Sequence, residues 1–117
     1  MANIKKLIAL SEWLTYELET TILDPPILKI KVRPINAMAT TDVGIENLKF
    51  GAVMIEMVID AVQEWDIADE GNPILCNDEM KRLHLPFLLS QKIKGKDTLL
   101  GIEVLRYAGD IEHFIRP

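Results

Sequence analysis

The segment from Lys49 to Trp65 constrains the fold of this chain more than any other. On a helical wheel its polar side chains fall on one arc of about 100°, and they are Lys49, Glu56, Asp60, Gln63 and Glu64. Nearly all of the remaining circumference is apolar, which is more than a surface helix with one apolar stripe needs. We therefore predict a long central helix over residues 49–65, buried on most of its sides.

The first third of the chain predicts a β-hairpin over about residues 16–33. Residues 16–23 and 28–33 alternate between apolar and polar and are rich in β-branched side chains. Asp24-Pro25-Pro26 between them favours a turn. Pro34 ends the second strand because it has no N–H to donate to a sheet.

Several shorter helices are expected around these two elements. Asn77 has the side chain of an N-cap, and Asp78 and Glu79 follow it where acidic groups favour a helix start. Pro86 suits the first position of a separate helix. Between the central helix and Asn77 we expect a loop. The expected helical ranges are 3–14, 77–84, 86–93 and 97–115.

These elements, in 117 residues, fit a single α+β domain over residues 1–117. We expect the hairpin to pack on a predominantly helical part, about residues 49–115, with the long helix at its centre. Hydrophobic residues make up 49% of the chain and the mean hydropathy is +0.13. Such a chain buries a core and keeps some apolar surface for a partner.

Charge and cysteine content exclude several classes of function. The net charge is −5, and residues 42–79 hold ten acidic groups against one basic group, whereas residues 80–106 hold six basic groups against two acidic ones. The basic groups are too scattered to follow a phosphate backbone, so we expect no nucleic-acid partner. No apolar run approaches the ~20 residues of a membrane span. Cys76 is the single cysteine, which suits a cytoplasmic chain without disulfides.

No catalytic, metal or cofactor site is expected. Asp66 opens a loop with a glycine six positions in, but Ala68 and Asn77 stand where an EF-hand needs oxygen ligands, so the bidentate carboxylate is missing. Cys76 and the two histidines are spaced too far apart for a compact zinc motif. The chain is predicted not to be an enzyme.

Glu56, Asp60 and Glu64 stand four residues apart on the predicted central helix. One interpretation is a solvated acidic face. The other is a docking strip for basic side chains, which either Lys92, Lys94 and Lys96 of this chain or another protein supplies.

The C-terminal segment carries more apolar side chains than one helical stripe can bury. If Leu100, Val104 and their helical neighbours face the core, then three apolar residues lie across the opposite side, namely Leu99, Ile102 and Leu105. An apolar client helix can lie on that surface, with Glu56, Asp60 and Glu64 or the lysines setting its direction. Alternatively, other parts of the fold cover these residues, or the segment is not one helix.

A set of motifs runs from Glu17 to Lys94, two thirds of the chain. A hairpin precedes Lys31-Val32-Arg33-Pro34-Ile35, a long helix ends in Trp65, and Asp69-Glu70-Gly71-Asn72-Pro73 follows before a capped helix. This order resembles the tail assembly chaperones of long-tailed bacteriophages, in which a V-R-P-L strand end and a W…D-x-x-G-x-P loop recur. The chain has Ile35 in place of the leucine usual in that family.

The resemblance implies a small α+β protein of the bacterial host's cytoplasm that is absent from the mature virion. Such a chaperone coats the long, hydrophobic tape measure protein and helps tail tube protein subunits to polymerise around it, without catalysis. Two other functions stay open: a structural protein of the tail or head–tail joint, and an acidic regulator or inhibitor that binds a basic partner. We expect a monomer or weak self-association.

Overall fold

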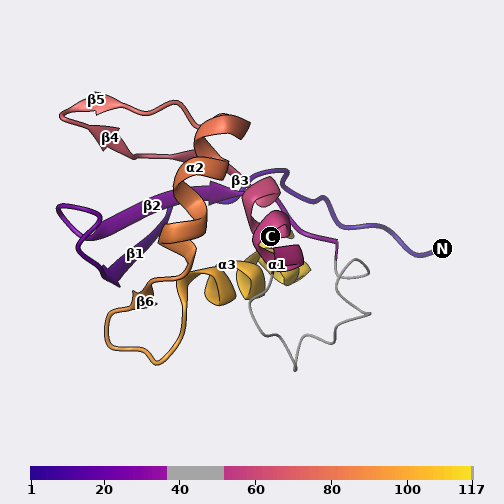
Figure 1. The fold of residues 1–117 in the computed structure, drawn as a ribbon. Coiled ribbons are helices and arrows are strands. Elements are labelled where there is room, and N and C mark those ends of the chain that lie inside the picture. The colour runs from indigo at the N-terminus through magenta and orange to yellow at the C-terminus, as the bar shows by residue number, and fades with distance from the viewer. Residues whose placement is uncertain (37–51, 117) are drawn as a thin grey trace.

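The computed structural model of the chain describes residues 1–36 and 52–116 (Figure 1). The start of the predicted central helix, residues 49–51, lies outside the described residues. So does most of the stretch between Ile35 and Phe50, where the sequence predicts at most a short or broken helix.

A four-stranded antiparallel sheet forms one layer of the molecule, in the order β3-β2-β1-β6. Its strands are β1 (Leu14–Glu19), β2 (Ile27–Val32), β3 (Val62–Trp65) and β6 (Lys92–Ile93). Residue pairing fixes the register, with Leu14 opposite Ile30 in β1–β2 and Ile30 opposite Trp65 in β2–β3. At the other edge, Leu18 of β1 lies opposite Ile93 of β6.

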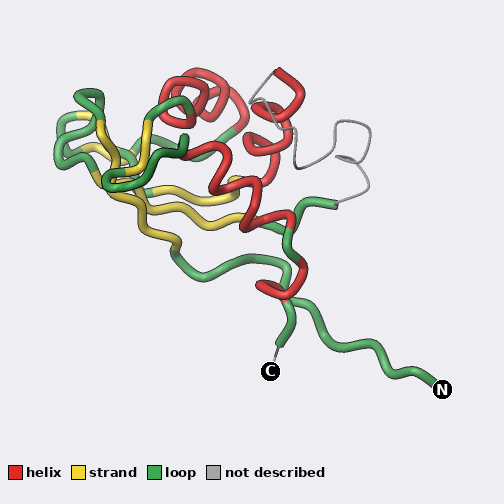
Figure 2. The backbone as a smooth tube through the Cα atoms, turned by 90° about the horizontal axis from the view of Figure 1, so that it is seen from below, coloured by secondary structure: helices red, strands yellow, loops and turns green. Residues whose placement is uncertain are grey.

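Helices cover one face of this sheet (Figure 2). They are α1 (Ala52–Ala61), α2 (Asp78–Leu89) and α3 (Leu100–Gly109), and the 3₁₀ helix η3 (Ile111–Phe114) follows α3. A separate two-stranded hairpin, β4 (Ala68–Asp69) and β5 (Asn72–Pro73), projects beyond the end of β3 (Figure 1).

The two faces of the sheet differ as the alternation in the strands requires. Leu28, Ile30 and Val32 of β2 are buried in the hydrophobic core beneath the helices. On the opposite face, ion pairs join neighbouring strands, and these are Lys31–Glu64 at 3.5 Å and Lys94–Glu17 at 3.0 Å. The core therefore lies between the sheet and the three α-helices.

The α+β class is as the sequence predicts, and β1 and β2 form an antiparallel hairpin close to the predicted bounds. The helix predicted to reach Trp65 is shorter than expected. The helix ends at Ala61, and the next residues form β3, which pairs with β2. Val62 and Trp65 are buried in this strand, as they would be in the helix. The burial of these two residues fits both structures, so pairing with a distant strand decides between them.

All four of the shorter predicted helices also differ from expectation. Residues 3–14 are not helical; Leu7 instead forms a bridge with Ile115. Residues 77–84 and 86–93 do not form two helices, because α2 continues through Pro86 to Leu89. The predicted N-cap is confirmed, since Asn77 Oδ1 accepts a hydrogen bond from the Met80 N–H at 2.8 Å. The C-terminal helix is split after Gly109, before η3.

Candidate binding groove

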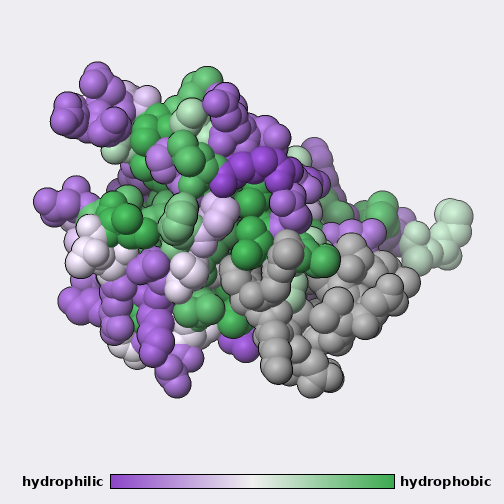
Figure 3. Space-filling model, viewed as in Figure 1, coloured by the Kyte–Doolittle hydropathy of each residue, from purple (hydrophilic) through white to green (hydrophobic). Residues whose placement is uncertain are grey.

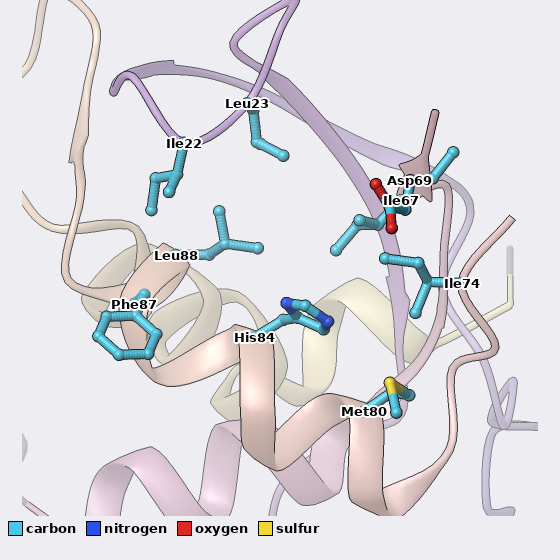
Figure 4. Close-up of a pocket in the computed structure, with 10 residues that line it drawn as sticks. Ile22, Leu23, Ile67, Asp69, Ile74, Met80, His84, Phe87 and Leu88 are labelled. Atoms are coloured by element: carbon cyan, nitrogen blue, oxygen red, sulfur yellow. The ribbon is translucent and has the colours of Figure 1, made fainter. Parts of the chain in front are cut away.

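A groove that is lined mainly by apolar side chains lies at one end of the sheet. It lies between α2, the turn that joins β1 to β2, and the β4–β5 hairpin, and its volume is about 490 Å³ (Figure 4). This volume is within the ~300–1,000 Å³ range of pockets that bind ligands. The lining residues are Ile22, Leu23, Ile67, Ala68, Asp69, Ile74, Met80, His84, Phe87 and Leu88.

Helix α2 provides the longest wall of the groove. Met80, His84, Phe87 and Leu88 share one face of α2 because they are spaced by four, seven and eight residues. Leu88 is buried at the bottom, whereas Phe87 is 66% exposed at the edge. A large aromatic side chain is thus left open to solvent beside an apolar hollow.

The opposite wall is held in place by hydrogen bonds to the end of β3. The indole Nε1 of Trp65 donates to the carbonyl oxygen of Ile74 at 2.7 Å, and the Ile74 N–H donates to Ile67 at 2.8 Å. The hairpin turns at Glu70 and Gly71, which have φ of 49° and 82°, values that suit a type I′ two-residue turn. This wall is therefore fixed to the sheet.

The groove is mainly apolar and has one imidazole and one carboxylate in its lining. His84 contacts the ring of Trp65 edge-on, with 6.3 Å between ring centroids. Asp69 is the only carboxylate among the lining residues. In the view of Figure 3, hydrophobic surface lies beside α2, between hydrophilic groups on the projecting loops. Such a surface suits an apolar segment with basic groups next to it.

The described residues include no group of three or more His, Cys, Asp or Glu placed to hold a metal ion. Within the same residues, no helix has the length and apolar character needed to cross a membrane. The groove itself combines one imidazole with one carboxylate among apolar side chains.

The predicted acidic strip does not exist as a continuous row. Glu56 on α1 accepts hydrogen bonds from Arg82 of α2 at 2.7 Å to both carboxylate oxygens. Glu64 lies on β3 instead of α1 and pairs with Lys31. Asp60 is exposed on α1. The hydrogen bonds that Arg82 donates to Glu56 and Asp78 raise the pKa of Arg82, and the pair with Glu56 joins α1 to α2.

The chain's own lysines do not meet that strip either. Lys92 pairs with Asp97 at 3.5 Å, and Lys94 pairs with Glu17 on β1. The interpretation of an internal contact between these lysines and the acidic residues of the central helix is therefore wrong.

The three apolar residues predicted to face away from the core are separated by the fold. Leu105 is 4% exposed and belongs to the core, because α3 presents two adjoining faces to other elements. Leu99 and Ile102 are half-buried and line a shallower hollow of about 270 Å³ together with charged neighbours. They remain a smaller candidate surface.

The groove was not predicted from the sequence, although part of its signal is present there. Met80, His84 and Phe87 have helical spacing, but a predicted break before Pro86 separates Phe87 from the other two. The other walls come from residues more than 40 positions away from each other, such as Ile22 and Ile67. No local pattern brings these segments together.

Comparison with protein-family models, with curated proteins and with solved structures finds no match to this chain. Its function is therefore inferred from its own residues and their geometry.

Proposed function

We propose that this protein is a non-enzymatic assembly chaperone that binds an apolar helical segment of another protein in the groove beside α2. The observation that carries the proposal is the open apolar groove with the exposed ring of Phe87 at its edge. Grooves of this kind take the apolar face of an amphipathic helix, with side chains three and four residues apart as anchors.

The resemblance of the sequence to tail assembly chaperones of long-tailed bacteriophages names the client. We infer that it is the tape measure protein, a long and hydrophobic chain. Its apolar surface has to be shielded from solvent until tail tube protein subunits assemble around it. Asp69 at the groove favours client segments with Lys or Arg next to their apolar face. The chaperone then acts in the host cytoplasm and leaves before the virion is complete.

Co-expression with the tape measure protein of the same phage tests this function. In the variant Phe87→Ser, we expect the fold to persist, because the ring is largely exposed, and the amount of co-purified client to fall severalfold. Leu83→Ser is the matched control, since Leu83 is an exposed residue of α2 that does not line the groove. Equal capture by both variants and the parent would overturn the groove assignment.

A parallel variant tests the surface first suggested by the sequence. Leu99→Ser with Ile102→Ser alters the shallower hollow beside α3 and leaves the groove intact. Loss of client with this variant, and not with Phe87→Ser, would move the site to α3. Finding the chain in purified, mature virions would instead favour a structural protein of the tail or head–tail joint.

A further inference from the structure

The first residues of the chain form an arm that points away from the rest of the molecule. The arm, defined as residues 1–6, is anchored at its base, where Lys6 accepts a hydrogen bond from the Arg116 N–H at 3.0 Å and Ile8 donates to Phe114 at 2.8 Å. Among the described residues, no hydrogen bond or ion pair holds residues 1–5 to the body. Ile4 is 94% exposed. An apolar side chain is thus presented to solvent on an extended segment.

The arm and the groove lie at opposite ends of the molecule. Figure 1 places the N-terminus on one side and the β4–β5 hairpin and the β1–β2 turn on the other. Figure 2 shows the same arm leaving the body from the end near η3. Five extended residues reach about 18 Å, whereas the longest dimension of the molecule is 55 Å. The arm is directed at a neighbouring molecule rather than at its own groove.

The charges of the arm and of the groove border are complementary. The segments that supply lining residues, 19–26 and 66–80, contain seven acidic side chains and no Lys or Arg. Asp69 lines the groove itself, and Asp78 is paired with Arg82. On α2, Arg82 is occupied by Glu56 and Asp78, and Lys81 is buried against Val62. The arm contains Lys5 and Lys6 and no acidic residue. Opposite charges at the rim of an apolar contact guide the partner and fix its direction.

We propose that the arm of one copy of this chain docks in the groove of a second copy, with Ile4 in the apolar hollow and Lys5 and Lys6 against the acidic border. The two surfaces of this contact differ, so the association is head to tail. The resulting assembly has a free arm at one end and a free groove at the other. The inference shares its groove with the proposed function, and a client helix therefore competes with the arm.

Sedimentation of the full chain over a range of concentrations tests the contact. We expect the average mass of the parent to rise with concentration and to fall with added salt, which screens the rim charges. Ile4→Asp places a charge on the arm, and Phe87→Asp places one at the groove. Each variant should stay monomeric. An equimolar mixture should form a one-to-one dimer, because one variant keeps its groove and the other keeps its arm.

A fluorescent peptide of residues 1–8 supplies a second measurement, and its binding to the parent does not depend on the folding of any variant. It should bind the parent and Ile4→Asp but not Phe87→Asp. A peptide with Lys5→Glu and Lys6→Glu should bind at least about tenfold more weakly, because like charges then meet at the rim. A parent that is monomeric at all concentrations and does not bind the peptide overturns the inference, as does Ile4→Asp protein that associates like the parent.

The same variants separate this inference from the proposed function. Ile4→Asp keeps an intact groove, so it should capture the tape measure protein at least as well as the parent. Capture without self-association would leave the function standing and overturn only the arm contact. Self-association without capture of the tape measure protein would support the arm contact and overturn the proposed function.

Discussion

Lys81 of α2 donates a hydrogen bond from its Nζ to the carbonyl oxygen of Val62, at 2.9 Å. Val62 begins β3, the edge strand of the sheet, and Lys81 is only 9% exposed. A lysine side chain from the helical layer therefore satisfies a backbone group at the sheet edge. Edge strands with unpaired backbone groups invite pairing with other chains, and a charged side chain there blocks it.

Replacing this lysine by methionine tests its structural role. Lys81→Met keeps most of the apolar stem but leaves the Val62 carbonyl without its close donor. We expect the free energy of unfolding to fall by about 1–3 kcal/mol, measured by urea denaturation. Lys96→Met, at an exposed position, is the control and should change stability little. Equal stability of the two variants would show that the buried hydrogen bond contributes nothing.

The thiol of Cys76 reports on the same region. Burial raises the pKa of Cys76, the positive charge of Lys81 lowers it, and Glu64 raises it. Because the thiolate is the reactive form, iodoacetamide should alkylate Cys76 more slowly than a free thiol at mildly alkaline pH. Lys81→Met should slow the reaction further, and Glu64→Gln should speed it. An alkylation rate that is the same in both variants as in the parent would contradict the electrostatic coupling.

The hydroxyl of Tyr16 on β1 predicts a loss of stability at alkaline pH. Burial, then the nearby Glu103 and Tyr107, raise the pKa of Tyr16 from 10.0 to about 12. Between these values the unfolded chain releases the proton and the folded chain retains it, so stability decreases as the pH rises. Chemical denaturation across this range should show a shallower decrease for Tyr16→Phe. An ultraviolet titration in which Tyr16 ionises near pH 10 would contradict the prediction.

Val58 on α1 has 0% exposure and lies in the core. Val58→Asp places an unpaired charge there and should cost about 3–5 kcal/mol, enough to unfold a domain of this size. Val53→Asp is the matched control, because Val53 is exposed on the same helix. Its thermal midpoint should stay close to that of the parent. A Val58→Asp protein that melts within a few degrees of the parent would remove α1 from the core.

The elements that the sequence predicts well depend on near neighbours along the chain. The start of α2 is predicted by Asn77 and by the acidic residues that follow it, since an N-cap contacts only the first turn of its own helix. The alternation within residues 28–33 likewise corresponds to β2 with its buried and exposed faces. The α+β class follows from the presence of both kinds of pattern.

The elements that the sequence predicts wrongly depend on distant contacts. Val62 and Trp65 stand three positions apart, a spacing that fits the buried face of a helix, yet residues 62–65 form β3 because Ile30 and Lys31 supply a strand to pair with. Pro86 removes one helical hydrogen bond and nevertheless lies inside α2, where Leu85, Leu88 and Leu89 are buried on both sides of it. Burial of these leucines offsets the local cost of the proline.

The sequence alone determined the class of fold, the cap of α2 and the surplus of apolar side chains over what one core needs. The groove was decided only by the tertiary structure. Its walls come from the β1–β2 turn, the β4–β5 hairpin and one face of α2, which are far apart along the chain. Sheet pairing and the hydrogen bond from Trp65 to Ile74 bring them together, and contacts of this range leave no periodic pattern in the sequence.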